Sequence, residues 1–217
     1  TMFTNGRVVA ENGLDVPDGI AVSPDNRFMA ISNHNNHCVS IFDLTAPTGP
    51  SAMIAGTLSG PSYPHGLRFS LDGKTLFVAD AGAPLVHRFD APDGNWAINA
   101  MASKSVRVLC EQVFLAGRHN EAEGGPKGLE LDSSGTIMAI TCEEQPLAFF
   151  SVERLFRGPQ FLCLSIEQPF HLPVFHVLPR LAALIEVSTE TAIVDRHKNY
   201  SAWHMARSGL GHRGPGP

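Results

Sequence analysis

His65 and Asp80, which lie 15 positions apart, have the side chains best suited to chemistry in this sequence. A carboxylate beside an imidazole fixes its tautomer and raises its basicity, and both groups are common ligands of divalent cations. We predict that His65 and Asp80 form a catalytic pair with His65 as general base, or that they hold a divalent cation such as Ca²⁺, Mg²⁺ or Zn²⁺. The alternative is a cross-strand hydrogen bond that only stabilises the sheet.

Equivalent positions in two other segments are also polar, with Asp18 and Asn33 in the first and Lys127 in the third. Asp18 and Asn33 offer oxygen ligands for a cation, although both residue types are also ordinary in turns. Lys127 opposes a cation and favours an anionic ligand such as a carboxylate. The predicted ligand-binding residues are Asp18, Asn33, His34, Lys127 and Glu143.

A repeat positions these residues along the chain. Its three copies align without a gap and begin at Pro17, Pro64 and Pro126, so the starts are 47 and 62 residues apart. Each copy predicts a strand with alternating apolar positions, a tight turn, a nearly continuous apolar strand and a third strand. This pattern and period are typical of an all-β fold, a β-propeller built from four-stranded antiparallel blades.

The predicted hairpins also locate the site, because residues equidistant from a tight turn face each other. The pairs expected on this basis are Asp18 with Asn33, His65 with Asp80, and Lys127 with Cys142. All three pairs lie at the open end of a hairpin, so in a closed ring they would converge at the mouth of the central channel. Propellers commonly bind ligands at that mouth.

The domain organisation expected is a set of propeller blades over residues 1–154, with blade motifs at 17–44, 64–91 and 126–152. The longer second spacing predicts an insertion of about 15 residues within 103–125. Residues 155–217 are expected to form a degenerate blade or an irregular segment with a flexible tail. Three clear blades are few for a closed ring, so the chain is expected to be part of a propeller, such as one of six or seven blades.

The segment PHGLRFSLDGKTLFVADAGAPLVHRFD resembles a blade of the NHL-repeat and YVTN-repeat propellers and of the gluconolactonase (senescence-marker lactonase) group. The resemblance covers residues 16–152. In the lactonases it implies a divalent metal held on the channel axis by a glutamate, two asparagines and the aspartate that ends the second strand. Asp80 matches that aspartate, whereas His65 replaces the asparagine of its motif.

Charge and composition narrow the function further. The 16 basic residues are scattered and the net charge is -5, which argues against nucleic acid as a partner. The apolar stretch near residue 170 contains charged residues and prolines, so no membrane span is predicted. The compartment stays open, either cytoplasmic or exported behind a missing upstream signal. We expect a protein that binds a small molecule, peptide or protein at the channel mouth; the alternative is a metal-dependent lactonase-like hydrolase.

Overall fold

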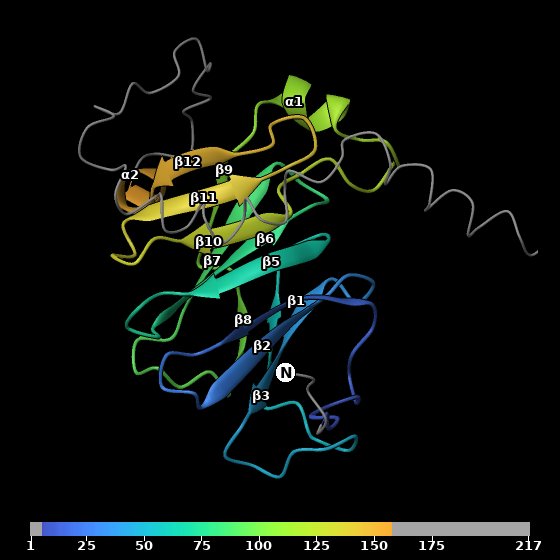
Figure 1. Cartoon of the computed structure of the whole chain (residues 1–217), viewed down its shortest axis with the longest axis vertical. Helices are drawn as coiled ribbons and strands as arrows, with labels where there is room; N and C mark the ends of the chain where they lie inside the picture. The colour runs from blue at the N-terminus through green and yellow to red at the C-terminus, as the bar shows by residue number, and fades with distance from the viewer. Residues whose placement is uncertain (1–5, 158–217) are drawn as a thin grey trace, which may run out of the picture. The chain divides into compact units, whose positions relative to one another are not determined.

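Three β-sheets, antiparallel apart from one parallel strand pair, and two short helices form within residues 6–157, the part of the chain that this computed structural model describes (Figure 1). The all-β fold class is therefore confirmed. The prediction for residues 155–217 lies, apart from the end of a short helix, outside the described residues. The propeller itself stays a prediction, because the three sheets of residues 6–157 are each open.

The three copies of the repeat each form one sheet. In the first sheet the strand order is β1 (Pro17–Val22), β2 (Phe28–Asn33), β3 (Cys38–Asp43), β4 (Gly56–Ser59) and a parallel β8 (Asn99–Met101). The second contains β5 (Pro64–Phe69), β6 (Thr75–Asp80), β7 (Leu85–Asp90) and β9 (Lys104–Arg107). The third contains β10 (Gly128–Leu131), β11 (Ile137–Thr141) and β12 (Ala148–Ser151). The predicted four strands are therefore found in the second sheet, whereas the first sheet has five, with β8 added, and the third has three among residues 6–157.

The turns between the first and second strands form where the sequence predicts them. Asn26, Gly73 and Gly135 have φ values of 59°, 69° and 68°, the left-handed region that asparagine and glycine tolerate best. In the second copy the Ser70 hydroxyl accepts the backbone N–H of Thr75 at 2.9 Å. Equivalent bonds run from the N–H of Phe28 to the Ser23 hydroxyl at 2.8 Å and from the N–H of Ile137 to the Asp132 carboxylate at 2.9 Å, so the same short segment folds into the same hairpin three times.

Two apolar clusters hold the sheets together face to face. One contains residues of the first and second sheets, and the other contains residues of the second and third together with α2 (Val152–Arg157). Trp96 is fully buried in the first cluster, and its indole N–H donates to the carbonyl oxygen of Gly73 at 2.8 Å. Burial of each large apolar side chain stabilises the fold by about 1.5–3 kcal/mol, so these clusters fix the sheets relative to one another.

The first strands of the three sheets approach one another closely, with β5 contacting both β1 and β10. A Cβ atom on Gly19 would lie 2.3 Å from the carbonyl oxygen of His65, and one on Gly66 would lie 2.5 Å from that of Lys127. The backbone N–H of Gly66 donates to that same Lys127 oxygen at 2.7 Å. The Pro-x-Gly motif therefore sets neighbouring x positions side by side, which are Asp18, His65 and Lys127.

The predicted cross-strand pairs are wrong in the first two copies. Asn33 pairs with Pro17 rather than Asp18, and Asp80 pairs with Pro64 rather than His65. The register shifts between Pro17 and Ile20 in the first hairpin and between Pro64 and Leu67 in the second, so the first strand of each carries an extra residue that the count from the turn did not include. The third hairpin shows no such shift between Gly128 and Leu131.

The predicted insertion contains β9 and a short helix, α1 (Glu111–Ala116), followed by a loop that leads to β10. Within residues 6–157, no helix is long and apolar enough to cross a membrane. The loop after α1 carries Glu123.

Candidate functional site

Five ionisable side chains meet at the end of the hairpins where the first strands begin. They come from separate elements: β1, the turn after β2, β5, the loop after α1 and the residue before β10. We call Asp18, His34, His65, Glu123 and Lys127 the ionisable cluster. It unites four residues predicted from the sequence with one that was not.

His65 is the centre of the cluster. Its Nδ1 lies 2.8 Å from Oδ2 of Asp18. Because a carboxylate only accepts, the proton sits on Nδ1 and the lone pair is left on Nε2. That Nε2 is buried and has no hydrogen-bond partner among the described residues. Burial lowers the pKa of His65 below its ordinary value, against the opposing charges of Asp18 and Glu123, so the neutral imidazole is favoured.

His34 lies against His65 and is held in place by aromatic contacts. Its ring centroid is 5.4 Å from that of His65 and 4.5 Å from that of Tyr63. Nε2 of His34 is 3.4 Å from Oε1 of Glu123. His37, in the same turn, instead packs edge-on against Tyr63 and contacts the carbonyl oxygen of Ser62 through Nδ1. Only the first histidine of the turn therefore joins the cluster.

Glu123 links the histidines to Lys127. Its Oε1 faces His34 and lies 3.9 Å from Nε2 of His65, while its Oε2 accepts a hydrogen bond from Nζ of Lys127 at 2.7 Å. Burial alone would raise the pKa of Glu123, but the hydrogen bond and charge of Lys127 outweigh it and hold that pKa below its ordinary value. The carboxylate is therefore ionised at neutral pH.

This geometry suits a divalent cation. One donor atom each from Asp18, His34 and His65 lie within 4.8 Å of one another. Asp18 already accepts from Nδ1 of His65, so the carboxylate that faces Nε2 of His34 and Nε2 of His65 is that of Glu123, at 3.4 and 3.9 Å. Two imidazoles and a carboxylate are ligands typical of Zn²⁺ and other transition metals, and a carboxylate on Nδ1 of a ligating histidine is a common supporting contact. Nε2 of His65 is buried and has no hydrogen-bond partner among the described residues, so it is the atom in the cluster that most needs one.

Asp80 lies outside the cluster, contrary to the predicted pair with His65. It is 1% exposed and accepts backbone N–H bonds from Ser62, Tyr63 and Gly82, at 2.8, 2.8 and 3.0 Å. Its Oδ2 also lies 3.0 Å from Nε2 of His87. Burial alone would raise the pKa of Asp80, but these hydrogen bonds outweigh it and lower that pKa. Ser62 and Tyr63 directly precede β5, Gly82 follows β6 and His87 is on β7. Asp80 therefore stabilises the second sheet.

Asn33 has the same structural role in the first sheet as Asp80 has in the second. It is fully buried, donates from Nδ2 to the Ser40 hydroxyl at 2.9 Å and accepts the backbone N–H of Asp15 through Oδ1 at 3.0 Å. Asn33 and Ser40 stand 47 residues before Asp80 and His87, so the two sheets repeat one buried contact with different side chains.

Glu143 lies elsewhere as well. Its Oε1 is 3.5 Å from Nε2 of His119, an exposed residue that follows α1. The structure therefore places Glu143 beside His119 and outside the ionisable cluster.

Glu123 is the cluster residue that the sequence did not reveal. It lies in the inserted loop and has no counterpart in the other two copies of the repeat. The available signal was its spacing, since a glutamate four residues before Lys127 is within reach of it. Tyr63, directly before the Pro-His-Gly motif, was not predicted either.

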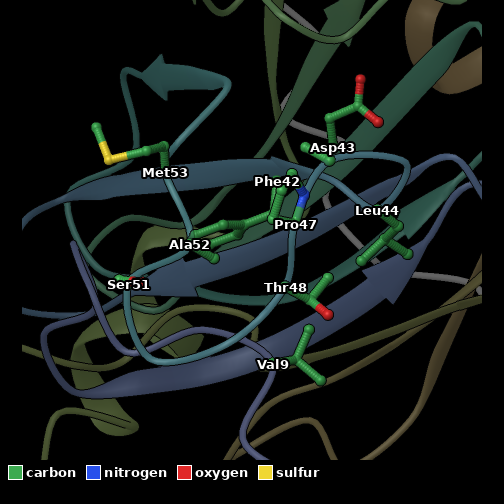
Figure 2. A pocket seen from close by; sticks show the side chains of 10 residues that line it. Val9, Phe42, Asp43, Leu44, Pro47, Thr48, Ser51, Ala52 and Met53 are labelled. Carbon is green, nitrogen blue, oxygen red and sulfur yellow. The ribbon is translucent and has the colours of Figure 1, made fainter.

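A separate hollow of about 210 Å³ lies near the end of β3 and the loop that follows it (Figure 2). Figure 2 shows mostly apolar side chains around it, including Phe42, Leu44 and Ala52, with the carboxylate of Asp43 at one side. None of its lining residues belongs to the ionisable cluster. The hollow and the cluster are therefore different features.

Comparisons with known proteins give no family. No family model matches the chain, and no curated protein matches it. Among solved structures, the chain is similar to hydrazine synthase of Kuenenia stuttgartiensis, with 18% identity and a TM-score of 0.48 over 71% of this chain. The match spans 37% of that protein's chain. At this level of similarity, nothing about function is transferred.

Proposed function

We propose that the chain is part of a β-propeller that binds a divalent metal cation at the mouth of its channel, through His34, His65 and Glu123. The repeat supports the propeller, because three sheets with the same hairpin pack face to face and bring their first strands together. The family resemblance of the second copy points the same way.

The observation that carries the metal proposal is the Nε2 atom of His65. It is buried, its lone pair faces Glu123 at 3.9 Å, and no described residue donates to it. An unpaired buried polar atom costs about 1–3 kcal/mol, and a bound cation would remove that cost. Asp18 would act as the group that orients His65, since its hydrogen bond to Nδ1 leaves Nε2 free to ligate.

A lactonase-like, metal-assisted hydrolase stays the alternative. The ligand set that the family resemblance implies includes the aspartate matched by Asp80. In this chain the carboxylate of Asp80 is already bonded to three backbone N–H groups and to His87. A hydrolase here would therefore need the ligand set of the ionisable cluster, and we propose binding as the primary function.

Calorimetric titration of the metal-free protein with Zn²⁺ tests the proposal. We expect one saturable site per chain, and we expect His65→Ala to lose it. Asp18→Asn keeps the ligands but weakens the orienting contact, so its affinity should fall by about 10–100-fold.

His119→Ala is the matched control, because His119 is an exposed histidine beside two glutamates outside the cluster. It should bind Zn²⁺ as the unmodified protein does. Equal binding by His65→Ala and the unmodified protein would refute the proposal.

A further inference from the structure

Lys127 is the member of the ionisable cluster that a simple cation site does not explain. Its ammonium group is bound to Oε2 of Glu123, while Oε1 of the same carboxylate faces the two histidines. A cation and the ammonium of Lys127 would therefore share one carboxylate. Their attraction to it must compete, because the negative charge of Glu123 is divided between them.

The charge of the cluster changes sign when a divalent cation enters. Without the cation, the two carboxylates of Asp18 and Glu123 outnumber the single ammonium of Lys127. The cluster is then negative and repels anions. A divalent cation makes the same set positive, so an anion is attracted in its place.

The cluster is open to solvent on the side of Lys127. The side chains of Lys127 and Asp18 are 39% and 41% exposed, whereas those of His34, His65 and Glu123 are between 12% and 18% exposed. A small ligand can therefore reach the ammonium group without entering the protein interior.

We propose that the metal-loaded cluster binds a small carboxylate-bearing ligand through the ammonium of Lys127, and that the metal-free cluster does not. This inference rests on the proposed metal binding. In the metal-free protein the carboxylate of Glu123 takes one of the three N–H donors of Lys127 and offsets its positive charge. Once the cation draws on Glu123, the charge of Lys127 is no longer offset, and the positive charge of the site favours a second carboxylate.

Acetate is a suitable probe because it carries one carboxylate and chelates metals weakly. Acetate would be titrated into the zinc-loaded protein and into the metal-free protein, with acetamide as the neutral molecule of the same shape. We expect saturable binding of acetate to the zinc-loaded protein only, and none of acetamide.

Lys127→Gln should bind Zn²⁺ more tightly than the unmodified protein, because the amide that replaces the ammonium carries no positive charge to compete with the cation for Glu123. Its affinity for acetate should fall by about tenfold or more, the loss expected for one charge-assisted hydrogen bond. Lys74→Gln, a change of an exposed lysine in the turn of the second copy, is the matched control and should change neither titration.

The two proposals fail in different ways. If Zn²⁺ does not bind, the proposed function and this inference are both refuted. If Zn²⁺ binds but acetate binds equally well without it, or equally well to Lys127→Gln, only the inference is refuted.

Discussion

Replacing Asp80 with asparagine separates a structural carboxylate from a metal ligand. The Oδ1 atom accepts the backbone N–H groups of Tyr63 and Gly82, and an amide oxygen can keep both bonds. The Oδ2 atom accepts the N–H of Ser62 and contacts His87, and in the variant an NH₂ group would take its place. Two donors would then face each other at Ser62.

The expected loss follows from these contacts. The partly buried N–H of Ser62 would lose its acceptor, which costs about 1–3 kcal/mol, and the lost negative charge weakens the remaining bonds. His87 can adapt, because its other tautomer accepts from the NH₂ group and donates from Nδ1 to the Ser105 hydroxyl at 2.7 Å. We therefore expect Asp80→Asn to lower the free energy of unfolding by about 2–3 kcal/mol, which is about 1–2 M in the urea midpoint.

The pH dependence gives a second measure of the same effect. The folded protein lowers the pKa of Asp80, so its contribution to stability is complete above the ordinary pKa of about 4. The contribution is lost as the pH falls through the lower, folded pKa. The difference in stability between the unmodified protein and Asp80→Asn should therefore be constant from about pH 5 to pH 8 and shrink below about pH 4.

Urea unfolding followed by tryptophan fluorescence is the assay, with Asp93→Asn as control. Asp93 is exposed, and its one hydrogen bond to the N–H of Asn95 can be kept by an amide, so the change should be within about 0.5 kcal/mol. Zinc affinity should be unaffected in both variants. Loss of zinc binding by a fully stable Asp80→Asn would refute our reassignment of Asp80.

Three further outcomes are expected. Gly66→Ala should lower the free energy of unfolding by about 2–4 kcal/mol, because its Cβ would force β5 away from β10 and break the bond to Lys127; thermal unfolding would detect this. Trp96→Phe should cost about 1–3 kcal/mol in urea unfolding, since it loses the bond to the Gly73 carbonyl and leaves a small void. Zn²⁺ at 100 times its dissociation constant should stabilise the protein against thermal unfolding by about 2.7 kcal/mol, and EDTA should reverse this; His65→Ala should show neither effect. Unchanged stability of Gly66→Ala or of Trp96→Phe would contradict the role given to that residue. A zinc effect that persists in His65→Ala would contradict the metal site.

The local parts of the fold were predictable because short segments determine them. The turns at Asn26, Gly73 and Gly135 need a left-handed backbone, and the residue types at those positions supply it. The alternating apolar positions then define the strands on either side. The three repeats also predicted that Asp18, His65 and Lys127 would lie near one another, and the Pro-x-Gly motif explains why they do.

The side-chain partners were less predictable, because they depend on one residue of register and on a loop. The register shift after Pro64 moved His65 away from Asp80 and beside Asp18. Glu123 comes from an insertion, so no copy of the repeat could point to it. Asp80 has the residue type of a ligand, but only the structure reveals that backbone N–H groups already bind its carboxylate.

Anomalous diffraction at the zinc absorption edge, from crystals grown with Zn²⁺, tests the central claim most directly. Our account predicts one strong peak within about 2.0–2.2 Å of nitrogen atoms of His34 and His65 and of an oxygen of Glu123. A peak at Asp80, or zinc bound only at surface residues such as His119 and Glu143, would contradict it.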